Sequence, residues 1–212
     1  MRKPVGTSLL FLSLCIQGFT YGHVPEHLIQ KAEDRYGGFV RNRFISYNQL
    51  LVSTKNSTEA DKLQLINDFF NNVPYMSDQK NWQQKDYWAT PMEFLARDKG
   101  DCEDYVIAKL FALKAVGVDP QKLFMTYVKS TRFELTHMVL AYFETPDADP
   151  LILDNTNYKI FPASKRSDLT PIYIFNADSL YLARKKGKSI KINPKIHKKW
   201  DTLMQRIQRN IL

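Results

Sequence analysis

The amino-acid sequence predicts an α+β domain, because helical and strand patterns occupy separate parts of the chain. Before Gly117, apolar residues recur at spacings of three and four, as in helices that pack on a core. After Gly117, short runs rich in β-branched and aromatic residues alternate with turn-forming residues. Helices followed by strands are typical of the α+β class. The chain has 212 residues, 44% of them hydrophobic, so we expect residues 23–212 to form a single domain with a sizeable core.

The first 22 residues have the pattern of a secretory signal peptide. Arg2-Lys3 forms a basic start, and an apolar run over residues 8–16 follows it. Residues 20–22 then offer small side chains at the positions that a signal peptidase favours. The apolar run is too short for an ordinary membrane span, and no later stretch of the sequence is long enough either. The alternatives are a disordered N-terminus, a short membrane anchor or, with less support, a lipoprotein modified at Cys15.

The next part of the chain predicts two helices separated by a less regular stretch. Residues 25–36 place apolar residues on one side, and Gly37-Gly38 would end that helix. The pattern is mixed up to residue 56, and residues 53–58 are expected to form a loop because Ser, Thr and Asn cluster there. Ser57 is the expected N-cap of a clear amphipathic helix that Pro74 ends. Its apolar residues predict a face turned to the core: Leu63, Ile66, Phe69 and Phe70.

Residues 75–89 are aromatic and polar, without a helical or strand period. The aromatic side chains, including Trp82 and Trp88, either pack over the core or line a cleft. Thr90-Pro91-Met92-Glu93 has the form of a capping box, with proline at the first helical position. A short helix is therefore expected over Met92–Arg97, with Lys99-Gly100 ending it.

A long apolar helix follows, and its first residues contain a cysteine. Asp101 is the expected N-cap before Cys102, and Gly117 stands where a C-terminal glycine belongs. Residues 105–116 are apolar on more than one face of the helix, so this helix is predicted to lie inside the domain.

Four runs after Gly117 are predicted to be strands. They cover residues 123–128, 137–143, 151–154 and 170–175. Residues 145–150 have the composition of a turn, so the second and third runs should form an antiparallel hairpin.

The C-terminal region is an amphipathic, basic helix in the sequence. The net charge of the chain is +8, but residues 183–212 alone carry ten basic residues against one acidic residue. Residues 23–182 are mildly acidic, with 18 basic and 21 acidic residues, which argues against a nucleic-acid-binding domain. The helix docks on the domain through its apolar stripe or presents a surface to a membrane or an acidic partner. The stripe consists of Ile196, Trp200, Leu203, Met204, Ile207 and Ile211.

Cys102 is the candidate nucleophile of the chain. The sequence has two cysteines, and Cys15 would be removed with the signal peptide, so an internal disulfide is excluded in the mature chain. A helix N-terminus favours a thiolate through its dipole and its unpaired N–H groups, which can also stabilise an oxyanion. The alternative is an inert buried cysteine that packs as a small hydrophobic residue.

His137 and Asp154 are the candidate partners of the thiol. The start of one hairpin strand faces the end of the next, so the two side chains should be neighbours. An imidazole there could take the thiol proton, and a carboxylate could orient the imidazole. A histidine satisfied by ordinary hydrogen bonds is the alternative. Zinc is disfavoured because Cys102, His137 and Asp154 are scattered singly along the chain.

The acidic residues around Cys102 predict a calcium site. Asp101, Glu103 and Asp104 would raise the pKa of the thiol unless a cation compensates their charge. Calcium is the natural candidate, because it binds carboxylate oxygens and is abundant outside the cytoplasm. The alternative is a set of solvated carboxylates that cap the helix, and the spacing is not that of an EF-hand.

Four separated segments carry a family pattern. They are Tyr87-Trp88-Ala89-Thr90-Pro91-Met92-Glu93-Phe94-Leu95, Gly100-Asp101-Cys102-Glu103-Asp104-Tyr105, His137-Met138-Val139-Leu140-Ala141-Tyr142 and Leu151-Ile152-Leu153-Asp154-Asn155. In order and spacing they closely resemble the bacterial transglutaminase-like cysteine proteinases over residues 25–180. The resemblance implies a papain-like, transglutaminase-like α+β fold, with the catalytic cysteine at a helix N-terminus packed on an antiparallel sheet.

The resemblance also implies the roles of the site residues. Cys102 would be the nucleophile, His137 the base and Asp154 the residue that orients the imidazole. The Cys102 backbone N–H would be one oxyanion donor, and Trp88 or another upstream side chain would be the second.

The resemblance further implies a metal, a substrate and a regulator. It implies calcium dependence, with Asp101 and Glu103 as ligands and Asp104 as a further one. The expected protein is a periplasmic endopeptidase that cuts the N-terminal region of a large surface adhesin at a dialanine site and so releases cells from a biofilm. The expected regulator is an inner-membrane cyclic-di-GMP receptor of the LapD type. Transglutaminase-type acyl transfer and a non-enzymatic periplasmic binding module are the alternatives.

Overall fold

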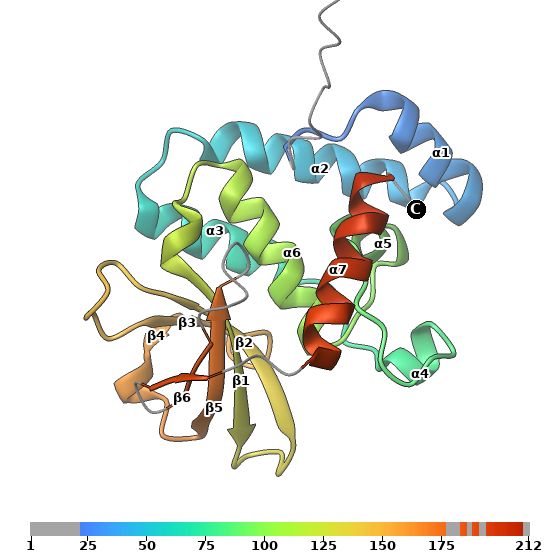
Figure 1. The fold of residues 1–212 in the computed structure, drawn as a ribbon. Helices are drawn as coiled ribbons and strands as arrows, with labels where there is room; N and C mark the ends of the chain where they lie inside the picture. The colour runs from blue at the N-terminus through green and yellow to red at the C-terminus, as the bar shows by residue number, and fades with distance from the viewer. Residues whose placement is uncertain (1–21, 177–182, 186–187, 191–193, 210–212) are drawn as a thin grey trace, which may run out of the picture.

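Most of the chain from residue 26 to residue 115 is helical, and strands dominate after Gly117, as the sequence patterns predict. The computed structural model describes residues 22–176, 183–185, 188–190 and 194–209; residues 1–21, nearly all of the predicted signal peptide, lie outside them. Figure 1 shows the helices gathered on one side and the sheet on the other. The helices are α1 (Glu26–Tyr36), α2 (Phe39–Thr54), α3 (Glu59–Asn71), α4 (Asp78–Asn81), α5 (Pro91–Arg97), α6 (Cys102–Ala115) and α7 (Pro194–Gln208).

The strands form one antiparallel sheet. Its order among the described residues is β4-β3-β2-β1-β5-β6-β7. The predicted hairpin is β2 with β3, in a register that pairs Leu140 with Leu153, and the predicted fourth strand is β5, which pairs with β1. The strands are β1 (Leu123–Ser130), β2 (Thr136–Tyr142), β3 (Leu151–Leu153), β4 (Phe161–Pro162), β5 (Leu169–Asn176), β6 (Ala183–Lys185) and β7 (Lys188–Ile190).

The structure corrects the sequence prediction around residues 39–58. A sixteen-residue helix, α2, occupies the stretch with the mixed pattern and runs to Thr54, inside the predicted loop. Its buried residues do follow helical spacing, but exposed Phe39, Ile45 and Val52 on the other side hide the pattern. The N-cap of α3 is Thr58 and not Ser57. The buried apolar residues of α2 are Val40, Phe44, Tyr47 and Leu51.

Hydrogen bonds at the N-termini fix the start of the two helices that flank the candidate site. In α5, the Thr90 side chain accepts from the Glu93 N–H, and the Glu93 carboxylate accepts from the Thr90 N–H, as predicted. In α6, Asp101 is the N-cap residue, as predicted; its backbone N–H donates to Oδ2 of Asp104 at 3.3 Å, and the Asp104 N–H donates to the Asp101 backbone carbonyl at 3.1 Å. Gly117 adopts a φ of 86° after the helix, a conformation that favours glycine.

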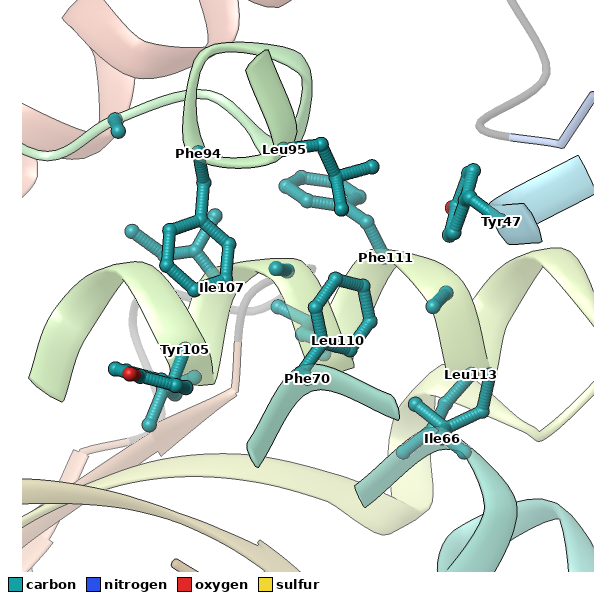
Figure 2. Close-up of a cluster of buried hydrophobic side chains, with 14 of the residues drawn as sticks. Tyr47, Ile66, Phe70, Phe94, Leu95, Tyr105, Ile107, Leu110, Phe111 and Leu113 are labelled. Atoms are coloured by element: carbon teal, nitrogen blue, oxygen red, sulfur yellow. The ribbon is translucent and has the colours of Figure 1, made fainter. Parts of the chain in front are cut away.

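Helix α6 is the centre of the core. Residues 104–113 are all buried, which agrees with an apolar surface on more than one face. Helix α6 packs against α3, α5 and β2, and Figure 2 shows side chains from α3 and α5 surrounding it. The labelled members of this cluster on other helices include Ile66, Phe70, Phe94 and Leu95. The nucleophile candidate therefore begins the most buried helix of the domain.

Helix α7 packs on the helical side of the domain (Figure 1). Trp200, Leu203 and Ile207 are buried, and the Trp200 ring stacks on Phe111 of α6 with centroids 6.0 Å apart. The apolar stripe thus docks on the domain, as one of the two sequence interpretations predicts, while the Ile196 and Ile211 side chains lie outside the described set. Within the described ranges, no helix has the length and apolar character needed to cross a membrane.

Candidate active site

Cys102 is the first residue of α6 and lies beside strand β2. Its side chain is half-buried, and its thiol donates a hydrogen bond to Oε2 of Glu103 at 2.8 Å. The backbone amide of Met138, the neighbour of His137 on β2, is close enough to the sulfur to lower the pKa of the thiol. The packing of α6 on the sheet thus brings the thiol to the start of the strand that carries the histidine.

The electrostatic surroundings hold the thiol in its neutral form. Burial raises the pKa of Cys102 well above its ordinary value, and the charges of Glu103 and Asp101 raise it further. The Met138 amide acts in the opposite direction but does not outweigh them. The thiol therefore keeps its proton at neutral pH and donates a hydrogen bond to the Glu103 carboxylate.

His137 and Asp154 form a buried pair, as the hairpin geometry predicts. His137 Nε2 lies 2.8 Å from Asp154 Oδ1, and the two residues are 8% and 1% exposed. An ionised carboxylate can only accept, so Nε2 carries the proton in this contact and Nδ1 is the acceptor nitrogen of the neutral imidazole. The orientation of the ring is therefore the one in which Nδ1 can receive a proton from another group.

Asp154 is held as a carboxylate by four donors. Besides His137, the Thr156 N–H donates to Oδ1 at 2.9 Å, the Thr156 hydroxyl to Oδ2 at 2.9 Å, and Arg166 Nη2 to Oδ2 at 2.7 Å. Burial favours the protonated acid, but the hydrogen bonds and charges of His137, Thr156 and Arg166 outweigh burial and lower the pKa of Asp154. Arg166 is itself fixed by Asp168, at 2.9 and 2.8 Å.

Three carboxylates gather beside the start of α6. One oxygen each from Asp78, Asp101 and Asp104 lies within 4.8 Å of the others, and Asp78 and Asp104 are buried. The structure thus brings together Asp101 and Asp104 of the predicted ligand set and adds Asp78, which the sequence analysis did not single out. The Glu103 carboxylate is not in this cluster and instead accepts the hydrogen bond from Cys102.

This acidic cluster has the properties of a cation site. Burial, followed by the neighbouring carboxylates, raises the pKa of Asp101 to about 10 and that of Asp104 well above its ordinary range. Burial likewise raises the pKa of Asp78 to about 6. Oδ1 of Asp78 and Oδ1 of Asp101 are buried and make no hydrogen bond within the described part of the chain. Buried carboxylate oxygens without donors match the ligands that calcium prefers, so the residues fit this metal.

The segment before α5 shapes the acidic cluster. The Tyr87 N–H donates to Asp78 Oδ2, and the Ala89 N–H donates to Asp104 Oδ1 at 2.8 Å. Gly100 allows the close approach on the other side, because a Cβ there would lie 2.6 Å from Asp104 Oδ2 and from the Phe94 ring. The carboxylates are therefore positioned by backbone groups that are distant from them in the sequence.

Helix α7 holds this same segment from outside. Arg206 donates to Glu93 Oε2 at 2.8 Å and also to the Tyr87 hydroxyl and the Trp88 carbonyl. Trp88, the suggested second oxyanion donor, is buried, and its indole N–H has no hydrogen-bond partner among the described residues. The indole thus has an unused donor, and its role in an oxyanion site stays a prediction.

Asp78, Thr156 and Arg166 also belong to the site, although no sequence pattern predicts them. Asp78 lies in the stretch without a period, 23 residues before Asp101, and nothing in its neighbours marks it as part of that cluster. Arg166 follows a short polar run, so its contact with Asp154 depends on the turn after β4 rather than on any local pattern.

Comparison with known proteins places the chain in a family. A model described as "bacterial transglutaminase-like cysteine proteinase BTLCP" matches residues 45–170. No curated protein matched.

Solved structures extend the similarity to nearly the whole chain. Legionella pneumophila LapG is 39% identical with a TM-score of 0.72, and the match covers 88% of this chain and 99% of that one. The EGTA-treated form of that protein gives 39% identity, coverage of 88% and 99%, and a TM-score of 0.75. The calcium-bound form gives 37% identity, coverage of 87% and 99%, and a TM-score of 0.73. The chain therefore belongs to the bacterial transglutaminase-like cysteine proteinases and has the α+β fold of LapG.

Proposed function

We propose that this cysteine proteinase is a calcium-dependent endopeptidase with Cys102, His137 and Asp154 as its catalytic triad. The observation that carries the proposal is the buried His137–Asp154 pair, in which Nε2 and Oδ1 are 2.8 Å apart. His137 lies near the start of β2, and the backbone amide of the next residue, Met138, is close enough to the Cys102 sulfur to lower the pKa of the thiol. Nucleophile, base and orienting carboxylate thus come from one helix and one hairpin.

The chemistry follows from these positions. His137 Nδ1 takes the proton of the Cys102 thiol, and the sulfur attacks the carbonyl carbon of the scissile peptide. The backbone N–H of Cys102 stabilises the oxyanion, with the Trp88 indole N–H proposed as the second donor. The imidazolium returns the proton to the leaving amine, which departs and leaves a thioester. A water molecule, deprotonated by His137, then attacks the thioester, and the thiol regains its proton as the acid product leaves. Asp154 keeps the imidazole oriented throughout and compensates its charge.

Calcium is proposed to bind the acidic cluster. Asp78, Asp101 and Asp104 would hold the ion, and Glu103 is kept as a fourth proposed ligand from the family resemblance. Bound calcium supplies positive charge next to the thiol. With that compensation, the carboxylates no longer oppose formation of the thiolate. The support is the set of buried carboxylate oxygens without donors and the existence of a calcium-bound form of the similar LapG.

The biological setting is proposed from the same likeness. Residues 1–22 would export the chain to the periplasm, where calcium is available. The substrate would be the N-terminal region of a large surface adhesin, cut at a dialanine site to release cells from a biofilm. A LapD-like inner-membrane receptor that binds cyclic-di-GMP would sequester the enzyme.

Cleavage of adhesin fragments tests the proposal. Purified residues 23–212 are incubated with candidate adhesin N-termini in calcium and in EGTA, and the products are read by mass spectrometry. We expect a single cut between two alanines in calcium, no cut in EGTA, and none with Cys102→Ala in either. Asp154→Asn should lower kcat by a factor on the order of 10³ to 10⁴, because the imidazole loses the partner that fixes its tautomer.

Other outcomes identify the alternatives. Glutamine residues that become cross-linked or amidated, without cut products, would indicate acyl transfer. A Cys102→Ala strain that still releases its biofilm would indicate a binding module and contradict both enzymes. Activity that is unchanged in EGTA, in protein shown to be free of calcium, would remove the metal from the proposal.

A further inference from the structure

Lys109 is a fully buried lysine that the triad chemistry does not use. It lies on α6 seven residues after Cys102, about two turns along the same helix, and none of its surface is exposed. An ammonium group inside a protein is strongly disfavoured unless hydrogen bonds replace its water shell. The buried Lys109 side chain therefore needs hydrogen-bond acceptors that offset the loss of its hydration.

Two asparagines of α3 supply those partners. Lys109 Nζ donates to Oδ1 of Asn67 at 2.8 Å and to Oδ1 of Asn71 at 2.7 Å. Both asparagines are buried, at 0% and 3% exposure. Their spacing of four residues places the two amides on one face of α3, turned toward α6.

The lysine fixes which way each amide points. Because Nζ donates to the Oδ1 atom of each asparagine, the NH₂ group of each amide must face away from the lysine. There, Asn71 Nδ2 donates to the backbone carbonyl of Asp154 at 2.9 Å, and Asn67 Nδ2 donates to the carbonyl of Tyr158 at 3.0 Å. A flipped amide would place NH₂ against the ammonium and an oxygen against a carbonyl, so the lysine enforces one polarity. The Tyr158 hydroxyl also donates to the backbone carbonyl of Asn71 at 2.8 Å.

We propose that Lys109, acting through Asn71, is a positioning residue for the triad. The buried chain of hydrogen bonds joins the helix of Cys102 to the backbone of Asp154 and so sets the orienting carboxylate relative to the nucleophile. Arg166, Thr156 and His137 hold the carboxylate itself, whereas Asn71 holds the main chain that carries it. Small displacements of a catalytic group have large effects on rate, so this main-chain contact bears on kcat. The inference rests on the proposed function.

The decisive experiment compares Asn71→Asp with Asn67→Asp. Each variant places a carboxylate against Lys109, which keeps the contact with the ammonium and introduces the same charge. Asn71→Asp, however, loses the donor to the Asp154 carbonyl, whereas Asn67→Asp loses the donor to Tyr158. We expect Asn71→Asp to lower kcat at least about tenfold with KM within about twofold, and Asn67→Asp to lower kcat less than about threefold. Melting temperatures should be similar in the two variants.

A second readout needs no substrate. The rate of Cys102 alkylation by iodoacetamide, measured against pH, reports how the thiol and His137 ionise together. We expect the midpoint of the plot of alkylation rate against pH to shift by about half a pH unit or more in Asn71→Asp and by less than that in Asn67→Asp. Lys109→Met should shift this midpoint as Asn71→Asp does, because both asparagine amides are then free to flip. If Lys109→Met does not fold, the comparison of Asn71→Asp with Asn67→Asp still tests the proposal.

Three results would overturn the proposal. One is an equal loss of kcat in the two asparagine variants, and another is a loss that follows their melting temperatures. The third is an alkylation profile of Asn71→Asp that matches the wild-type protein. If no tested adhesin is cut by the wild-type protein, the proposed function fails while the alkylation profiles still test the positioning role.

Discussion

Asp154 and Lys109 are both buried, and their partners decide their charge in opposite ways. Asp154 receives the guanidinium of Arg166 and three further donors, so its pKa falls although burial opposes ionisation. Lys109 donates only to the oxygens of two neutral amides, so burial lowers its pKa to about 7 despite the attraction of Asp154. A neutral acceptor satisfies a hydrogen bond without supplying the opposite charge, and this difference has a measurable effect on stability.

The stability of the protein should depend on pH through Lys109. The pKa of Lys109 is about 7 in the folded state, below its ordinary value of 10.5, so the unfolded chain binds more protons between these limits. The destabilising effect of the buried ammonium is therefore complete below about pH 7 and disappears as pH rises toward 10.5. We expect the free energy of unfolding of the wild type, minus that of Lys109→Met, to increase from pH 7 to pH 9 in urea titrations. A difference that is constant over this range would contradict the assignment.

Asp78 should contribute to calcium affinity although the sequence gives no sign of it. Replacing Asp78 by Asn removes one of three gathered anionic oxygens, so we expect calcium to bind at least about tenfold more weakly in calorimetric titrations. Asp86→Asn is the matched control, because Asp86 is acidic, lies in the same segment and pairs with Lys199 on α7. The control should change the affinity by less than about threefold. Equal affinities of Asp78→Asn and wild type would exclude Asp78 from the site.

The site residues that sequence could predict are those with local signals. Cys102 is marked by a helix start, and His137 and Asp154 are marked by strand ends that a hairpin must bring together. Asp78 and Arg166 reach the site through tertiary packing alone, so no local pattern identifies them. Lys109 looks like one polar residue in an apolar helix until the asparagines of α3 are placed beside it.

Among the elements, α7 is attached to the domain by charge as well as by apolar packing. Arg206 reaches Glu93, Tyr87 and Trp88, and its guanidinium lies over the Tyr87 ring at 4.4 Å. The Tyr87 amide in turn donates to Asp78 in the acidic cluster. The basic C-terminal helix therefore supports the segment from which two of the cluster carboxylates receive hydrogen bonds.

Arg206→Met should loosen that segment. The change leaves the buried Glu93 carboxylate without its cationic donor, so we expect the protein to lose about 2 kcal/mol of stability in urea titrations performed in EGTA. Arg209→Met is the control, because Arg209 is an exposed arginine directly after the same helix, and the change should cost less than about 0.5 kcal/mol. Equal effects of the two variants would show that Arg206 does not act through Glu93.

The elements themselves were predictable where caps and period agree. The Thr90 capping box and the Asp101 cap locate α5 and α6 to within a residue. Helix α2 was not predicted because apolar residues also occupy its exposed side, which removes the contrast that a periodic pattern needs. The Ser57 prediction fails by one position, since Thr58 offers a hydroxyl of the same kind and accepts from Asp61.

For the whole molecule, calcium should act as a stabilising ligand. The acidic cluster joins three separate parts of the chain, namely α4, the start of α6 and the segment before α5, so an ion there binds the folded state only. At a calcium concentration of 100 times Kd, the expected gain is about 2.7 kcal/mol, which raises the melting temperature by about 5–10 °C. Thermal melts in calcium, in EGTA and in an equal concentration of magnesium measure this effect. No difference between calcium and EGTA would contradict a calcium site in the folded domain.

The central position of α6 has a consequence for how fast different parts of the active site exchange hydrogen with solvent. The amides of a helix buried on every side exchange only when the whole domain unfolds, so the nucleophile is attached to the slowest-exchanging part of the molecule. The Ala89 amide, which donates to Asp104, belongs instead to a segment without regular structure between α4 and α5. Deuterium uptake at Ala89 should therefore report the opening of the acidic cluster while the helix that bears Cys102 stays closed.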